Sequence, residues 1–280
     1  MTAKSPAASA PRVPTLAFRG GVFVAAERAV PEEVAIAISV NGSTHAVMMA
    51  TPDNVEELGL GLALNERIVA ASSEIERIEV VDTEIGLDCQ LWLAEERGAT
   101  YTARRRQMTG PVGCGLCGVE SLELATPALP KVSSIAAFSA QAIIAGMEAM
   151  ARAQALGRET RAVHAAAFHG PSGDVTREDV GRHNALDKVA GALALAGTDP
   201  ASGFLTITSR VSVELIQKAA IMGVGLIAAV SVPTALAIRE AEAAGVTLVA
   251  VARGDEFEIF THPHRVLGAV AEEPKASHAA

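Results

Sequence analysis

Two cysteines lie close together in a glycine-rich stretch of the sequence. Residues 113–118 read GCGLCG, so Cys114 and Cys117 form a Cys-x-x-Cys pair. Such a pair serves as half of a zinc site, as a redox disulfide or as thiols that carry sulfur, or it is a structural coincidence without chemical role. The third cysteine, Cys89, falls in a stretch whose pattern is typical of a strand. The chemistry that this sequence offers therefore starts from Cys114 and Cys117.

The surroundings of the pair bear on these alternatives. A zinc site needs four ligands, and the sequence has no second cysteine pair. His164 and His183 are candidates for the missing ligands, but the stretch HAAAF lacks the glutamate that accompanies the zinc-binding histidine of a deaminase. A redox pair of the thioredoxin type begins a helix, whereas the glycines around this pair favour a loop. We therefore expect no metal, and we favour a mobile loop that carries sulfur.

Three arginines precede the loop at residues 104–106, eight to ten residues before Cys114. Positive charge close to a thiol lowers its pKa and so increases the fraction of reactive thiolate. A solvated run of charge is the plain alternative for these arginines.

A second cluster of ionisable groups occurs in TREDVGRHNALDKVAG, residues 176–191. His183 and Asp187 are four residues apart and share one face of a helix, as do Asn184 and Lys188. One interpretation is capping followed by such pairs on a solvated surface. The cluster nevertheless exceeds what capping requires, which favours a functional role. Its members are Arg177, Glu178, Asp179, Arg182, His183, Asp187 and Lys188.

Two strand-to-helix loops carry hydroxyl groups and positive charge. The first, in TSRVSVELIQKA, contains Ser209 and Arg210, and the second, in SVPTALA, contains Ser231 and Thr234. We place Pro233 at the first helical position of the second loop. Helix N-terminal amides at such loops bind phosphate, and Arg253 follows the next strand. These features predict a pocket for a phosphorylated ligand.

The elements that position these residues follow from hydrophobic patterns. Asn41–Gly42 lies between two β-rich runs and predicts a hairpin. A helix follows with Asp53 as its N-cap, and then strands at 75–81 and 87–94, which together indicate an α+β unit with an antiparallel sheet. From about residue 138, apolar strands alternate with helices of about a dozen residues, which is typical of a buried sheet covered by helices. Ligands of such sheets bind beyond the strand C-terminal ends.

These patterns predict an α/β protein with a smaller N-terminal α+β domain and a larger C-terminal domain. The proline- and serine-containing segment 121–137 is interpreted as the linker. The expected divisions are a disordered tail at 1–14, the N-terminal domain at 15–120 ending in the cysteine loop, the linker at 121–137, the C-terminal domain at 138–270, and a disordered tail at 271–280.

Composition limits the partners and the cellular compartment that we expect for this protein. The formal net charge of −9 disfavours nucleic acid and anionic membranes as partners. The most apolar stretch, residues 219–232, is shorter than the roughly 20 residues of a membrane span, and the first residues lack the apolar core of a secretory signal. Three cysteines make no disulfide framework, so we expect a protein of the reducing cytoplasm.

Four motifs, taken together, resemble one known family. They are CGLCG, REDVGRHNALDK, TSRVSVELIQKA, and SVPTALA followed by VTLVAVARG and THPHR, and they stand in the order in which that family has them. The sequence resembles the formate dehydrogenase accessory sulfurtransferases, the FdhD family, over nearly its whole length. This resemblance implies a C-terminal domain with the three-layer cytidine deaminase-like fold, without the deaminase zinc ligands.

The resemblance also implies a function. The protein would accept sulfur from a cysteine desulfurase as a persulfide and transfer it to molybdenum bis(molybdopterin guanine dinucleotide), for insertion into apo formate dehydrogenase. Cys114 would bear the persulfide with Cys117 as its partner, and the protein would be a homodimer. The alternative is a non-catalytic chaperone for the cofactor, with a structural or metal-binding cysteine pair. The cofactor-binding stretch would be Val251, Ala252, Arg253, Gly254, Asp255 and Glu256.

Overall fold

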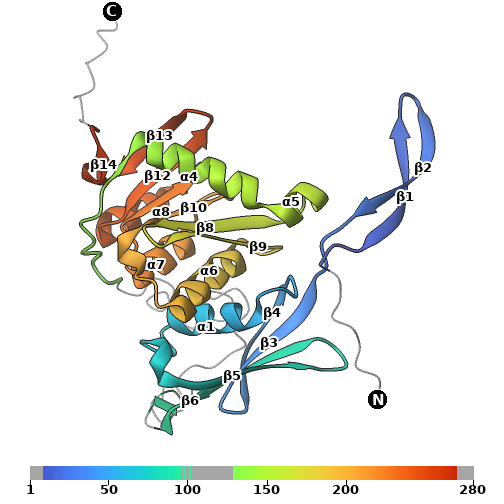
Figure 1. The fold of residues 1–280 in the computed structure, drawn as a ribbon, viewed down its shortest axis with the longest axis horizontal. Coiled ribbons are helices and arrows are strands. Elements are labelled where there is room, and N and C mark those ends of the chain that lie inside the picture. Colours follow the sequence, from blue (N-terminus) through green and yellow to red (C-terminus); the bar gives the residue numbers. More distant parts are fainter. Residues whose placement is uncertain (1–8, 96, 99–100, 102–128, 270–280) are drawn as a thin grey trace, which may run out of the picture.

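The computed structural model of the protein describes residues 9–95, 97–98, 101 and 129–269. Cys114, Cys117 and Arg104–Arg106, and the expected C-terminal tail at 271–280, lie outside the described residues. The described chain is a mixed α/β fold, as the sequence predicted, and its two larger sheets are a four-stranded sheet before the gap and a six-stranded sheet after it (Figure 1). The elements before the gap are β1 (Arg12–Arg19), β2 (Val22–Ala29), β3 (Val34–Val40), β4 (Ser43–Ala50), α1 (Val55–Asn65), β5 (Ile75–Asp82) and β6 (Leu87–Leu93).

The smaller sheet has the strand order β4-β3-β6-β5, with α1 packed on one face. The predicted hairpin is confirmed, because β3 and β4 pair antiparallel around Asn41–Gly42. The expectation of a purely antiparallel sheet is wrong, because β3 and β6 run parallel. The chain crosses over through α1 from β4 to β5, the two outer strands, which therefore run in the same direction. Because β4 pairs antiparallel with β3 and β5 pairs antiparallel with β6, the two central strands are also parallel.

The larger sheet has the strand order β13-β12-β11-β10-β8-β9. Strands β10, β11 and β12 run parallel, so their C-terminal ends share one edge of the sheet. The elements after the gap are β7 (Phe138–Ser139), α4 (Ala140–Ala153), α5 (Ala155–Thr160), β8 (His164–Gly170), β9 (Gly173–Asp179), α6 (Arg182–Ala196), β10 (Phe204–Ile207), α7 (Val213–Met222), β11 (Leu226–Ala229), α8 (Ala235–Ala244), β12 (Thr247–Arg253), β13 (Glu256–Thr261) and β14 (Val266–Leu267).

Helices cover both faces of the larger sheet (Figure 1). Along β10, Leu205 packs against the core shared with α6, α7 and α8, whereas Phe204 packs against the core under α4. Neighbouring residues of a strand point to opposite faces, so a strand covered on both faces is apolar throughout. The continuous apolar runs in the sequence therefore follow from this double cover.

Three details differ from the sequence-based expectations. The N-cap of α1 is Asn54 and not Asp53, and Asn54 adopts the left-handed conformation that asparagine tolerates better than most residues. Strand β1 begins at Arg12, inside the segment expected to be a tail. Strand β9 was not predicted, because its polar sequence GDVTRED lies at the edge of the sheet and has no apolar pattern to reveal it.

Helix α1 and helix α6 approach each other so closely that their backbones touch. A Cβ added to Gly61 would lie 1.7 Å from the carbonyl oxygen of Asp187, and one added to Gly191 would lie 1.9 Å from that of Glu57. No side chain fits at either position, because packed atoms do not overlap. Helix α1 is thus enclosed between the smaller sheet and α6, which explains why apolar residues occur around most of its circumference.

No helix within the described ranges combines the length and the apolar character needed to cross a lipid bilayer.

The helix crossing gives a test of this packing. Substitution Gly61→Ala is expected to lower the free energy of unfolding by about 3 kcal/mol, because the new methyl group collides with the backbone of α6. In the control Gly197→Ala the methyl group meets no atom of the described residues within 4 Å, so only the left-handed backbone is strained, at a cost of about 1 kcal/mol. Urea denaturation followed by circular dichroism measures both values. Equal losses in the two variants would contradict the close crossing.

Candidate functional site

The two predicted loops and the cofactor stretch meet at one edge of the larger sheet. The loop after β10 contains Ser209 and Arg210, the loop after β11 contains Ser231 and Thr234, and residues 251–256 follow at the end of β12. The first two loops are joined, because the backbone N–H of Thr234 donates to the carbonyl oxygen of Val211 at 3.0 Å. The parallel strands bring these segments together, as expected for C-terminal strand ends.

Two hydroxyl groups in these loops, those of Ser209 and Thr234, already have local partners. Ser209 is buried, and its Oγ donates to the backbone oxygen of Arg210 at 2.9 Å. Thr234 is the N-cap of α8, and its Oγ1 accepts a hydrogen bond from the N–H of Ala237 at 3.2 Å. Pro233 therefore precedes the N-cap, and its placement at the first helical position is wrong. The exposed groups at this edge with ligand-binding chemistry include the side chains of Arg210 and Arg253.

The end of β12 is distorted at Val251. This residue has φ 55°, a left-handed conformation that strains a β-branched residue, and the pairing of β12 with β13 shifts register between Ala250 and Arg253. Gly254 is also left-handed, with φ 59°, and turns the chain into β13. Because of this bulge, Val251 packs toward the core that Ala250 also faces, instead of alternating with it.

A hollow of about 200 Å³ lies beside this bulge, between α4 and the strand ends. Three residues of the predicted cofactor stretch line it, namely Ala252, Gly254 and Glu256. Ser209, Arg210, Ser231 and Thr234 do not line it. The sequence analysis did not find its other wall, which α4 contributes, because the small and apolar residues of that helix look like ordinary core. The remaining lining residues are Ile143, Ile144, Met147, Glu148, Ala151, Val230 and Phe257.

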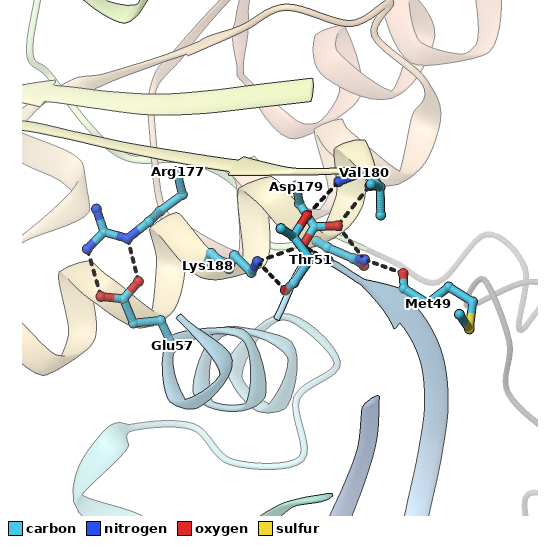
Figure 2. Close-up of polar contacts among 9 residues, drawn as sticks. Met49, Thr51, Glu57, Arg177, Asp179, Val180 and Lys188 are labelled. Carbon is cyan, nitrogen blue, oxygen red and sulfur yellow. Dashed lines mark hydrogen bonds and ion pairs between the residues drawn. The ribbon is translucent and has the colours of Figure 1, made fainter. Parts of the chain in front are cut away.

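The charged motif at 176–191 connects the two sheets of the protein (Figure 2). On β9, the guanidinium of Arg177 forms a two-pronged ion pair with Glu57 of α1. Asp179 and Lys188 pair at 2.6 Å, and both side chains are fully buried. Thr51, the residue after β4, completes this pair, because its N–H donates to Asp179 at 3.1 Å and its carbonyl oxygen accepts from Lys188 at 3.0 Å.

The helical pairs expected within this motif do not form. Lys188 binds Asp179 on β9, and Asp187 accepts two hydrogen bonds from Lys218 of α7, at 2.7 and 2.9 Å. Asn65 of α1 donates to the same Asp187 carboxylate at 2.7 Å. Pairing on one solvated helix face is therefore the wrong interpretation of these residues, whose partners lie on other elements.

His183 lies at the start of α6, next to the first strand-end loop. Its Nε2 atom is 3.5 Å from Ser212 Oγ and 4.0 Å from Glu214 Oε2. The side chain is 23% exposed. Arg182, beside it, has a buried Nε atom with no hydrogen-bond partner among the described residues. The start of α6 thus adds positive charge close to the strand-end loops.

Burial and three neighbouring cations keep His183 uncharged. Burial, together with the positive charges of Arg182, Lys218 and Arg210, lowers the pKa of His183 to about 4, although Glu214 opposes the shift. At neutral pH the imidazole is therefore neutral. Any anion bound here would be held by the arginines and not by a protonated histidine.

The one described cysteine is unreactive. Cys89 is buried in the smaller sheet against Gly59 of α1, and burial, with the negative charges of Glu56 and Asp88, raises the pKa of its thiol to about 12. A thiol that stays protonated is a poor nucleophile. Tyr101, the last described residue before the cysteine pair, has its hydroxyl 2.9 Å from His45 Nδ1.

Comparison with known proteins identifies the family. A sequence model of the FdhD/NarQ family matches residues 31–267. The chain belongs to this family. The sulfur carrier protein FdhD of Agrobacterium fabrum is 50% identical over 263 residues, which cover 93% of this chain and 97% of the relative. The sulfur carrier protein FdhD of Brucella abortus is 49% identical over 255 residues, covering 90% and 95% of the two chains. The resemblance found in the sequence is thus confirmed.

A solved structure shares the fold of this FdhD/NarQ protein. The crystal structure of a formate dehydrogenase accessory protein from Desulfotalea psychrophila superposes with a TM-score of 0.75 and covers 93% of this chain and 100% of its own. The two sequences are 22% identical, so the likeness concerns the fold alone.

The lowered pKa of His183 makes a prediction about pH. Between about pH 6.5 and pH 4, the unfolded FdhD/NarQ chain binds a proton at His183 that the folded chain does not bind. The free energy of unfolding should therefore fall as the pH drops through this window. Substitution His183→Gln should reduce that fall by up to about 3 kcal/mol, at 1.36 kcal/mol per unit of pKa.

Urea denaturation at several pH values measures the difference between wild type and variant, in which the contributions of all other groups cancel. Parallel pH profiles for the two proteins would contradict the lowered pKa of His183.

Proposed function

We propose that this FdhD/NarQ protein carries sulfur as a persulfide on Cys114 and transfers it to molybdenum bis(molybdopterin guanine dinucleotide). The cofactor is a substrate here, loaded with sulfur before it enters formate dehydrogenase. The observation that carries the proposal is the burial of Cys89, which raises the pKa of its thiol to about 12 and keeps it from reacting. With three cysteines in the chain, sulfur chemistry is left to Cys114 and Cys117. Relatives named sulfur carrier proteins support the same role.

The sulfur steps balance with two thiols. The Cys114 thiolate attacks the terminal sulfur of a cysteine desulfurase persulfide, the donor S–S bond breaks, and the donor cysteine leaves as a thiolate. Delivery of that sulfur as sulfide requires two electrons. The Cys117 thiolate supplies them when it attacks the inner sulfur of the Cys114 persulfide, which releases sulfide and leaves a disulfide between the two cysteines. Two cellular thiols then reduce this disulfide by exchange and are themselves joined as a disulfide.

The strand-end edge is the proposed binding site for the guanine dinucleotide. The hollow beside Val251 is smaller than the roughly 300–1,000 Å³ of pockets for drug-sized ligands, so it suits one ring system and not the whole cofactor. Glu148 and Glu256 line it, and carboxylate oxygens accept hydrogen bonds from the N–H groups of a guanine. Exposed Arg210 and Arg253 at the same edge suit the phosphates.

The proposal includes three macromolecular contacts. A cysteine desulfurase donates the sulfur, apo formate dehydrogenase receives the loaded cofactor, and the protein acts as a homodimer in the cytoplasm. The net charge of −9 disfavours nucleic acid as a partner.

Persulfide formation tests the proposal directly. After incubation with a cysteine desulfurase and cysteine, we expect the intact mass of the protein to increase by one sulfur atom. Cys114→Ala should abolish this gain, and Cys89→Ala should retain it, because the Cys89 thiol is buried and protonated. Wild type that gains no sulfur and instead holds stoichiometric zinc would overturn the proposal in favour of a metal-binding chaperone.

A separate experiment tests the nucleotide site. Ala151 lines the hollow and is exposed, so Ala151→Trp is expected to fill the hollow without disturbing the core. Affinity for GDP, the nucleotide fragment of the cofactor, should fall by at least about tenfold, or 1.4 kcal/mol. The matched control Ala153→Trp changes an exposed residue of the same helix that does not line the hollow, and should bind like wild type. Isothermal titration calorimetry measures both, and equal affinities would exclude the hollow as the site.

A further inference from the structure

Strands β1 and β2 form a hairpin, residues 12–29, that extends away from both sheets of the protein (Figure 1). We call this hairpin the arm. Its two strands pair with each other as a separate two-stranded sheet, joined by a turn at Gly20–Gly21 in which both glycines are left-handed. At its base, Arg28 donates to the backbone oxygen of Thr160 on α5 at 3.5 Å.

The outer half of the arm is apolar on one face and carries two valines beside Arg19 on the other. On one face, Phe18 and Phe23 are directly opposed with ring centroids 5.1 Å apart, and Leu16 lies beside them. These three side chains are 65%, 68% and 68% exposed, respectively. The other face carries Val22 and Val24, which are 59% and 37% exposed. Contiguous apolar surface of this kind marks an interaction site.

We propose that the arm is the element through which two copies of this chain form a dimer. The inference rests on the homodimer in the proposed function and assigns its contact surface. An isolated two-stranded hairpin is marginally stable in water, so the arm needs a permanent cover. A sulfur donor or acceptor binds only transiently and leaves the arm exposed between encounters. A second copy of the chain is present whenever the protein is present.

The exposed area matches what a stable dimer requires. An aromatic side chain buries roughly 150–250 Å² when fully covered, so two phenylalanines at about two-thirds exposure offer roughly 200–330 Å². With Leu16, Val22 and Val24, the arm offers roughly 500 Å², a size typical of functional patches. In a twofold dimer each arm contributes once and covers a similar area on its partner. The total reaches roughly 2,000 Å², within the range of stable interfaces.

The composition of the arm also fits a contact between identical chains. Homodimer interfaces are more apolar than transient ones and avoid charge at their centre. The charged residues of the arm, Arg12, Arg19, Glu27 and Arg28, lie at the turn or toward the base. The stretch between them therefore forms an apolar centre with a charged border.

The test compares two double variants of the full chain. Phe18→Ser with Phe23→Ser removes the aromatic pair of the arm, and Ile85→Ser with Ile135→Ser is the control, because these isoleucines are 90% and 97% exposed elsewhere on the surface. Sedimentation velocity over a range of concentrations measures the dimer dissociation constant. We expect wild type and control to dimerise equally, and the arm variant to dimerise at least about a hundredfold more weakly, because buried aromatic residues dominate interface energies.

A second measurement remains informative if the arm variant folds poorly. Hydrogen exchange of wild type should show the amides of residues 12–29 protected at high protein concentration and losing that protection on dilution, in step with dissociation. If wild type is monomeric at every concentration, both the role of the arm and the proposed homodimer are overturned. The persulfide experiment is unaffected by that result. If the folded arm variant dimerises like wild type, the arm alone is overturned.

Discussion

The buried ion pair between Asp179 and Lys188 is the interaction on which the arrangement of the two sheets depends. Both side chains are fully buried, so neither charge has water to solvate it, and each relies on the other. The Asp179 carboxylate also accepts hydrogen bonds from Asn184 and from the N–H groups of Gly181 and Thr51, while Lys188 donates to the carbonyl oxygen of Thr51. A buried pair tolerates only geometries in which all these bonds are made, because a lone buried charge costs several kcal/mol. Thr51 belongs to the smaller sheet unit, so this requirement fixes how that unit sits on the larger sheet (Figure 2).

Once the two units are fixed in this way, α1 must lie directly on α6, and the other contacts follow. The close crossing requires Gly61 and Gly191, and it brings Glu57 within reach of Arg177 on β9. The dense charge of the REDVGRHNALDK motif is thereby explained mainly as a connection between the two units. His183 differs from the rest of the motif, because it lies beside the strand-end loops and is kept neutral by burial and neighbouring cations.

The same arrangement buries the Cys89 thiol and leaves the strand-end edge of the larger sheet accessible to a ligand. Cys89 is enclosed under α1, where its thiol stays protonated, so a reactive thiol at that position would require the smaller unit to open. In the larger sheet, the bulge at Val251 interrupts the alternation of side chains between the two faces of β12. It places Ala252 and Gly254 against the hollow under α4. The fold tolerates a strained residue at this strand end because the sheet is apolar, is covered by helices on both faces and is well packed.

The sequence by itself determined the family, the mixed α/β class and the hairpin at Asn41–Gly42, because each depends on local motifs or on patterns within a single element. It also predicted that the loops after β10, β11 and β12 lie at one edge of the sheet, because the C-terminal ends of parallel strands point the same way. It did not reveal β9, a polar edge strand without an apolar pattern, or the wall that α4 gives to the hollow. Only the tertiary structure decided the partners of the charged motif. A carboxylate such as Asp179 pairs with whatever cation the fold brings within about 3 Å, and that distance is set by packing between segments more than a hundred residues apart in the sequence.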